Sequence, residues 1–289
     1  MISDVENCRR TVNKIVSKLG DLPSAPDILN KAIKLTSDLD SNITDVSRSI
    51  AADQSISGKV IRMSNSPIFA RMKRVSSLDE AIKVLGFNQL KSIIITASTF
   101  QMFGNCTHAD VALKLWHHSF STAIAARLIA DRLTALNKDE AYLAGLMHDV
   151  GKLILLKTAP IVYTGLIEVV VNTQSGFVPE EQKELGFDHT DVGVALLDQW
   201  NFPQHILTAV ADHHRCNLAV TAAAEQLARV IALANSVSRY IGTDFYEPYK
   251  TRINEEYYLG PDAIEGDRLI MIQCDTESEF NSELSLLND

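Results

Sequence analysis

The chain has 289 residues, of which 46% are hydrophobic, and it carries a formal net charge of −9 at neutral pH. This length and apolar content suffice for one large core or two modest ones, which excludes a disordered chain. No stretch approaches the roughly 18 to 20 apolar residues of a membrane-spanning helix, and the N-terminus lacks the apolar segment of a signal peptide. We therefore expect a cytoplasmic protein that does not bind membranes.

Charge and histidine are unevenly distributed along the chain. Residues 1–107 carry a net charge of +4, residues 108–245 carry −5 and residues 246–289 carry −8, and all eight histidines lie between His108 and His214. We predict an N-terminal helical lobe over 1–107, a second lobe over 108–245 that holds the histidine cluster, and an acidic C-terminal tail over 246–289. This balance argues against a general nucleic-acid binder.

The first third of the chain predicts a series of amphipathic helices. Apolar residues recur at helical spacing over 8–19, 27–36, 44–52 and about 55–63. Ser77 and Glu80 have the spacing of a capping box before a further helix over 78–85, which Gly86 ends. The β-branched run that follows, up to Phe103, also fits a strand, but its length favours a helix.

Four basic residues gather around the predicted loop between two of these helices: Arg62, Arg71, Lys73 and Arg74. They predict either a surface that binds an anionic ligand or a partner, or simply a solvated face. Runs of like charge are usually solvated faces, so the solvated face is the simpler interpretation.

The middle of the chain predicts helices that carry candidate metal ligands. In the long helix predicted over 111–133, His118 lies on the apolar face, whereas its neighbour His117 lies on the polar one. A buried imidazole needs a hydrogen bond or a metal, so His118 is either a satisfied core histidine or a ligand. The next helix, capped by Asn137, ends at the adjacent His148 and Asp149.

The segment AGLMHDVGKLIL, residues 144–155, places an imidazole and a carboxylate side by side. That pair suits a borderline divalent ion such as Fe, Mn, Zn or Ni. Taken alone, however, a polar pair at a helix C-terminus, where His compensates the helix dipole, is the simpler interpretation of these two residues. We expect Gly151 to let the backbone leave this helix sharply.

The remaining elements are also predicted as helices. Residues 161–172 are predicted as helix, although a buried strand fits the pattern. Asp188 has the position of an N-cap for a helix that places His189 in the core, and Pro203 that of the first residue of a helix leading to His213 and His214. A small-residue-rich helix over 222–240 places Asn235 inward. The sequence predicts an all-α, two-lobed helical bundle.

Several segments together resemble the HD superfamily of metal-dependent phosphohydrolases: WHHS, AGLMHDVGKLIL, ELGFDHTDVGVALLDQWNFPQHI, ADHH and ARVIALAN. The first third, with LPSAPDILNKA and IRMSNSPIF, resembles the HDOD subgroup, an all-helical relative of the HD-GYP domain of bacterial signalling proteins. The resemblance implies that His118 is the first metal-binding histidine, that His148 and Asp149 form the HD doublet, and that Lys152 is the lysine after it. It further implies that His189, His213 and His214 complete a multi-metal site.

The pattern departs from the superfamily at the last ligand, where Asn235 stands in place of an aspartate. An amide oxygen can coordinate a cation but brings no negative charge, so we expect the site to hold a divalent metal weakly or not at all. A GYP motif after the two histidines is also missing.

Two functional classes follow from the resemblance. In the first, which we favour, the protein is a non-catalytic regulatory module of bacterial signal transduction that binds a partner protein or a nucleotide. In the second, it is a metal-dependent phosphohydrolase acting on phosphomonoesters, nucleotides or cyclic nucleotides, with Asp149 and Lys152 as catalytic residues. The acidic tail either docks on the basic first lobe or is solvated and mobile.

Overall fold

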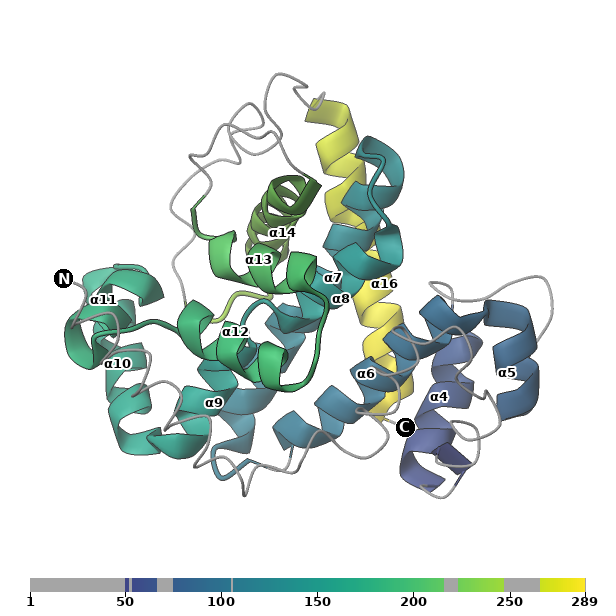
Figure 1. Ribbon diagram of the computed structural model, residues 1–289, viewed down its shortest axis with the longest axis horizontal. Coiled ribbons are helices and arrows are strands. Elements are labelled where there is room, and N and C mark those ends of the chain that lie inside the picture. Colours follow the sequence, from purple (N-terminus) through teal and green to yellow (C-terminus); the bar gives the residue numbers. More distant parts are fainter. Residues whose placement is uncertain are drawn as a thin grey trace.

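The computed structural model describes residues 50–51, 54–66, 75–104, 106–215, 223–246 and 266–288, and every regular element in these ranges is an α-helix (Figure 1). The all-α fold class is therefore confirmed. The helices predicted over 8–19 and 27–36, and most of the one over 44–52, lie outside the described ranges. So do Arg71, Lys73 and Arg74.

The described helices follow one another in this order: α4 Gln54–Ser64, α5 Leu78–Leu85, α6 Phe87–Gly104, α7 Ala109–Leu133, α8 Lys138–Met147, α9 Val150–Thr158, α10 Pro160–Thr173, α11 Phe177–Leu185, α12 His189–Gln199, α13 Gln204–Asp212, α14 Ala223–Tyr240 and α16 Gly266–Asn288. Helix α6 and helix α10 settle the two helix-or-strand alternatives in favour of helix. Helices α11 and α16 were not predicted.

Capping side chains fix several helix starts. The Asn137 side chain accepts hydrogen bonds from the backbone of residues 139 and 140, and Asp188 forms a full capping box with Asp191. At α5, Ser77 Oγ accepts from the Glu80 backbone at 3.2 Å, but the Glu80 carboxylate is held by Ser76. Pro203 is the N-cap of α13 and not its first helical residue, so this helix begins one residue later than predicted.

Helix α7 forms the centre of the molecule. Sixteen of its 25 residues are buried, and it packs against α6, α8, α14 and α16 (Figure 1). Alanine, serine and threonine dominate its middle turns, and such small side chains let neighbouring helices approach closely on every side. A residue on α7 is therefore placed at the junction of several helices.

The C-terminal helix α16 is a packed element. It lies along α7 and also contacts α4 and α14. At its C-terminal end, Arg62 Nε donates to the Leu286 carbonyl at 2.9 Å, and Lys59 Nζ donates to the Leu287 carbonyl. Basic side chains at this position satisfy carbonyls that the helix leaves without partners. The alternative of a mobile tail is thus wrong for residues 266–288.

None of the helices in the described ranges is both long and apolar enough to cross a membrane. The division of the chain at residues 107 and 245 stays a prediction.

Candidate metal centre

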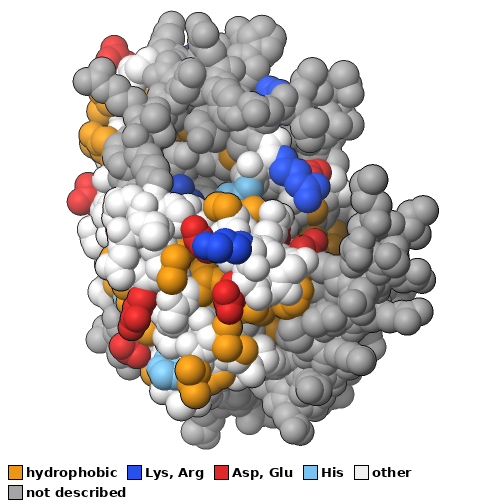
Figure 2. Space-filling view, turned by 90° about the vertical axis from the view of Figure 1, so that its left-hand side faces the viewer, with side chains coloured by type: hydrophobic (Ala, Val, Ile, Leu, Met, Phe, Trp, Pro, Cys, Tyr) orange, Lys and Arg blue, Asp and Glu red, His pale blue; other side chains and the backbone are white. Residues whose placement is uncertain are grey.

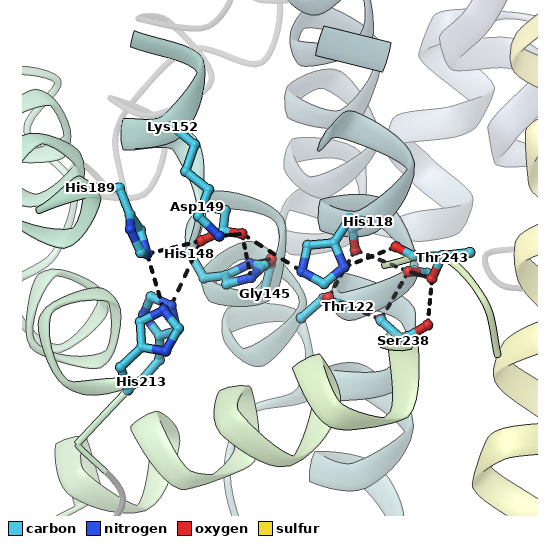
Figure 3. A network of polar contacts seen from close by, with 12 residues as sticks. His118, Thr122, Gly145, His148, Asp149, Lys152, His189, His213, Ser238 and Thr243 are labelled. Carbon is cyan, nitrogen blue, oxygen red and sulfur yellow. Dashed lines mark hydrogen bonds and ion pairs between the residues drawn. The ribbon is translucent and has the colours of Figure 1, made fainter. Parts of the chain in front are cut away.

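Asp149 lies at the centre of a group of histidines (Figure 3). It is the N-cap of α9, but its side chain makes no capping hydrogen bond, which leaves the carboxylate for other partners. Lys152 Nζ forms an ion pair with Asp149 Oδ2 at 2.8 Å. Four imidazole Nε2 atoms approach the same carboxylate: His189 at 3.2 Å, His148 at 3.4 Å, His118 at 3.7 Å and His213 at 3.8 Å.

The second ring nitrogen of each of these histidines is held by a fixed oxygen. Nδ1 lies 2.7 Å from the Gly145 carbonyl in His148, 2.7 Å from the Val210 carbonyl in His213, 3.0 Å from the Thr243 carbonyl in His118, and 2.6 Å from Glu181 Oε2 in His189. A carbonyl oxygen can only accept, so Nδ1 carries a proton in the first three rings, and Nε2 is the ring atom that faces Asp149 and could ligate a cation. Metal-ligating histidines are commonly oriented in this way.

The ligand atoms fall into two groups that share Asp149. One group contains Asp149, His189, His213 and His214, and the other contains His118, His148 and Asp149; within each, the candidate ligand atoms lie within 4.8 Å of one another. His148 Nε2 and Asp149 Oδ1 are buried without a hydrogen-bond partner. Buried polar atoms normally find a partner, and a cation would supply one. Imidazole and carboxylate donors fit a first-row divalent ion.

The electrostatics of Asp149, His118 and His213 suit a cation. Burial raises the pKa of Asp149, but His148 and Lys152 outweigh this effect and hold the pKa well below its usual range. Burial lowers the pKa of His118 and of His213 well below that of free imidazole, so both rings are neutral donors. His189 differs: burial lowers its pKa, but Glu181 opposes this more strongly and raises the pKa to about 9, so this ring has to release a proton before it can bind a cation.

Two glycines flank the His148–Asp149 pair and allow close helix packing. A Cβ on Gly145 would lie 2.9 Å from the Ala123 Cα, so α8 approaches the backbone of α7 directly. A Cβ on Gly151 would lie 1.9 Å from the His189 carbonyl oxygen. Gly151 is a helical residue of α9, so the expected sharp exit of the backbone at this position is wrong. Its role is to let α9 approach the start of α12.

Two groups that orient the candidate ligand histidines, the Glu181 carboxylate and the Thr243 carbonyl, were not predicted from the sequence. Glu181 is fully buried, and it accepts from both Nδ1 and the backbone N–H of His189, the latter at 2.9 Å, and from the Tyr163 hydroxyl at 2.7 Å. It lies in the charged run PEEQKEL, where only its spacing of four residues from the buried Phe177 distinguishes it from its less buried neighbours. The Thr243 carbonyl lies beyond the end of α14 and carries no sequence signal.

The other predicted residues have different positions. His214 is half-buried, and its Nε2 lies 3.1 Å from that of His189. Asn235 is buried on α14, which packs against α7 and α13, and its Oδ1 has no hydrogen-bond partner. Arg62 is engaged with the end of α16. Its assignment to a ligand- or partner-binding surface stays a prediction, as do the metal-ligand roles.

Known proteins share this fold and sequence pattern. The HDOD domain family model matches residues 22–216. An HDOD domain protein of unknown function from Geobacter sulfurreducens has a crystal structure with a TM-score of 0.76 at 24% identity, covering 99% of this chain and 98% of that chain. A protein from Shewanella amazonensis SB2B, provisionally described as a phosphohydrolase, has a TM-score of 0.74 at 21% identity, with 94% and 97% covered. These likenesses establish the fold alone.

A relative of longer chain is also similar. An uncharacterised protein of Treponema pallidum (strain Nichols) is 23% identical over 240 residues, which is 82% of this chain and 45% of the relative. The chain thus spans less than half the length of that protein.

Proposed function

Because the chain belongs to the HDOD family, we propose that it is a non-catalytic regulatory module of bacterial signal transduction, whose His/Asp centre holds a divalent cation as part of its structure. The observation that carries this proposal is the burial of the centre. Asp149, His148 and His189 are fully buried, and the exposed fractions of Lys152, His118 and His213 are only 1–2%. A phosphoester substrate would have to reach these atoms, so the function lies in binding a partner protein or a nucleotide elsewhere.

The surroundings of Lys152 support the same proposal. Its Nζ is bound to Asp149 at 2.8 Å and lies 4.4 Å from the centre of the Phe177 ring. A lysine that screens a substrate phosphate needs donors free to face it, whereas this ammonium is already neutralised by a carboxylate and covered by an aromatic ring.

The second candidate is a metal-dependent phosphohydrolase, and the two ligand groups around Asp149 favour it. A divalent cation bound there would supply Lewis-acid chemistry. In that case Asp149 and the histidines would hold the cation, and Lys152 would have to leave Asp149 to meet a phosphate. The half-buried His214 marks the side of the cluster nearest to solvent.

Metal content and turnover, measured together on the full chain, test both candidates. We expect protein dialysed against Fe, Mn or Zn to retain metal in elemental analysis, Asp149→Ala to lose it, and neither to hydrolyse bis(p-nitrophenyl) phosphate, nucleotides or cyclic dinucleotides. Metal-dependent turnover that disappears in Asp149→Ala would establish the phosphohydrolase instead. Absence of retained metal in the unaltered protein would refute the cation-binding part of the proposal.

A further inference from the structure

Helix α10 exposes an apolar face that no described part of the chain covers. The exposed fraction is 86% for Ile161, 44% for Val162 and 41% for Val169. The opposite face of the same helix buries Tyr163 and Val170. In Figure 2 hydrophobic side chains occupy the face of the molecule that bears α10 and α11, between acidic and basic ones. In a helix with apolar residues on both faces, one face packs on the core and the other is left free to bind a partner.

The exposed face forms one wall of a groove between α10 and α11. The groove has a volume of about 320 Å³, with Ile161, Val162, Gly165, Leu166 and Val169 on the α10 side and Glu180, Lys183 and Glu184 on the α11 side. An apolar floor with a charged rim is the form of site that takes the apolar stripe of an amphipathic helix.

No described part of the chain explains the glycine at position 165, in the middle of this face. Its φ is not positive, and a Cβ at this position would have no atom within 4 Å. Glycine inside a helix costs roughly 1 kcal/mol relative to alanine, so the position gives up stability without any local need. It lies between Val162 and Val169 on the exposed face, where the missing Cβ allows the backbone of another helix to approach closely.

The charges of the rim indicate which kind of helix fits. Glu180 and Glu184 line the groove and Glu168 is exposed on α10. Among the described residues that line the groove the one cation is Lys183, whose Nζ already lies 3.5 Å from Glu180. A second copy of this chain would bring the same excess of carboxylates, and like charges facing one another oppose association. A helix with Lys or Arg beside its apolar stripe complements the rim.

We infer that the groove between α10 and α11 is the docking site for a basic amphipathic helix of a partner protein. This inference rests on the proposed regulatory function and specifies its partner. The inner faces of the same two helices hold Tyr163 and Glu181, which are hydrogen-bonded to each other and, through Glu181, to His189. Movement of α11 against α10 on docking therefore changes the acceptor that orients His189, so partner binding and metal binding are coupled, each altering the other's affinity by the same factor.

A synthetic peptide of about 18 residues tests the docking site on the full chain. It carries Leu at helical spacing with Lys on both flanks, and a matched peptide carries Glu instead of Lys. We expect fluorescence anisotropy to show binding of the Lys peptide, at least tenfold weaker binding of the Glu peptide, and at least tenfold loss for the Lys peptide with Val162→Glu or Gly165→Leu. The matched control is Met271→Glu, since Met271 is 60% exposed on α16, and it should bind as the unaltered protein does.

The coupling has its own readout, which is separate from metal content and turnover. Zn²⁺ should change the affinity of the unaltered protein for the Lys peptide, and Tyr163→Phe should reduce that change. No binding of the Lys peptide, or equal binding of both peptides, overturns the inference. Self-association that Val162→Glu abolishes would overturn it in favour of a second copy. Neither result would affect the proposed function, which is decided by retained metal and turnover.

Discussion

The carboxylate of Asp149 has two kinds of partner. Lys152 neutralises Oδ2 at 2.8 Å, whereas Oδ1 is buried without a hydrogen bond and faces the Nε2 atoms of His189 and His213. A buried unpaired oxygen costs roughly 1–3 kcal/mol. Oδ2 is therefore paired with the lysine, and Oδ1 is the oxygen that a cation could meet once His189 has released its proton.

Glu181 is predicted to set the metal affinity of this centre through His189. In Glu181→Gln the orienting carboxylate loses its charge, so we expect the affinity for Zn²⁺, measured by competition with a chelating dye, to fall roughly 10- to 100-fold. Glu180→Gln is the matched control, because Glu180 precedes it on α11 and pairs only with Lys183 among the described residues. Equal affinities of the two variants would show that Glu181 serves packing alone.

Lys91 on α6 is predicted to destabilise the folded state in a pH-dependent way. Burial lowers its pKa to about 8, against a smaller opposing effect of Glu140. Between about pH 8 and 10.5 the unfolded chain keeps a proton that the folded chain has lost, so stability rises with pH in that window. Below it, the cost of burying the ammonium is fully present.

Lys91→Met removes this cost while keeping the volume of the side chain. We expect it to raise the free energy of unfolding by roughly 1–3 kcal/mol at pH 7, with the gain disappearing as the pH approaches 10. Urea unfolding at both pH values measures the difference, and Lys83→Met, at an exposed position of α5, controls for the loss of a charge. A gain independent of pH would count against burial as its cause.

At the scale of the helix, much of the site could be predicted from residue pattern. The inward position of His118 followed from the periodicity of α7, and the caps at Asn137 and Asp188 followed from side chains that satisfy free N–H groups. Helix α11 could not be predicted in this way, because it is short, charged and buries little beyond Phe177 and Glu181. Hydrophobic periodicity predicts a helix from several apolar residues on one face, and one buried carboxylate does not create such a pattern.

The close packing of helices at Gly145 and Gly151 could not be predicted from the sequence, although both glycines are apparent in it. A glycine inside a helix is compatible with a turn, an open surface or a close neighbour, and only the neighbour distinguishes these. Gly151 has the His189 carbonyl oxygen at 1.9 Å from its hypothetical Cβ, whereas Gly165 has nothing within 4 Å. The two positions are a matched pair within consecutive helices.

We predict opposite effects of alanine at these two glycines. Gly151→Ala must push α9 away from α12 and separate Asp149 from His189, so it should lower the free energy of unfolding by several kcal/mol and weaken metal retention. Gly165→Ala should raise the free energy of unfolding by about 0.5–1 kcal/mol, because only helix propensity changes. Thermal unfolding of both variants measures this, and a stable Gly151→Ala protein with its metal retained would refute the packing argument.

At the scale of the whole molecule, α16 packs on the core although the net charge of its part of the chain predicted a separate tail. The eight excess negative charges after residue 245 suggested a separate tail. Yet α16 buries Leu269, Ile272, Phe280 and Leu287, and Arg132 binds Asp275 at 2.7 Å. Asp267 and Glu277 are exposed on the outer face of this amphipathic helix, whereas Glu283 is buried, and the inner face completes the core around α7.

A matched pair of substitutions within α16 tests whether this helix is part of the core in solution. Ile272 is 1% exposed and Ile270 is 57% exposed. Ile272→Ala should lower the free energy of unfolding by about 2–5 kcal/mol, since it leaves a cavity against the central helices. Ile270→Ala should change the free energy by less than about 0.5 kcal/mol, because its side chain is already in water. Urea unfolding gives both values, and equal, small effects would mean that α16 is detached and that the core around α7 is closed without it.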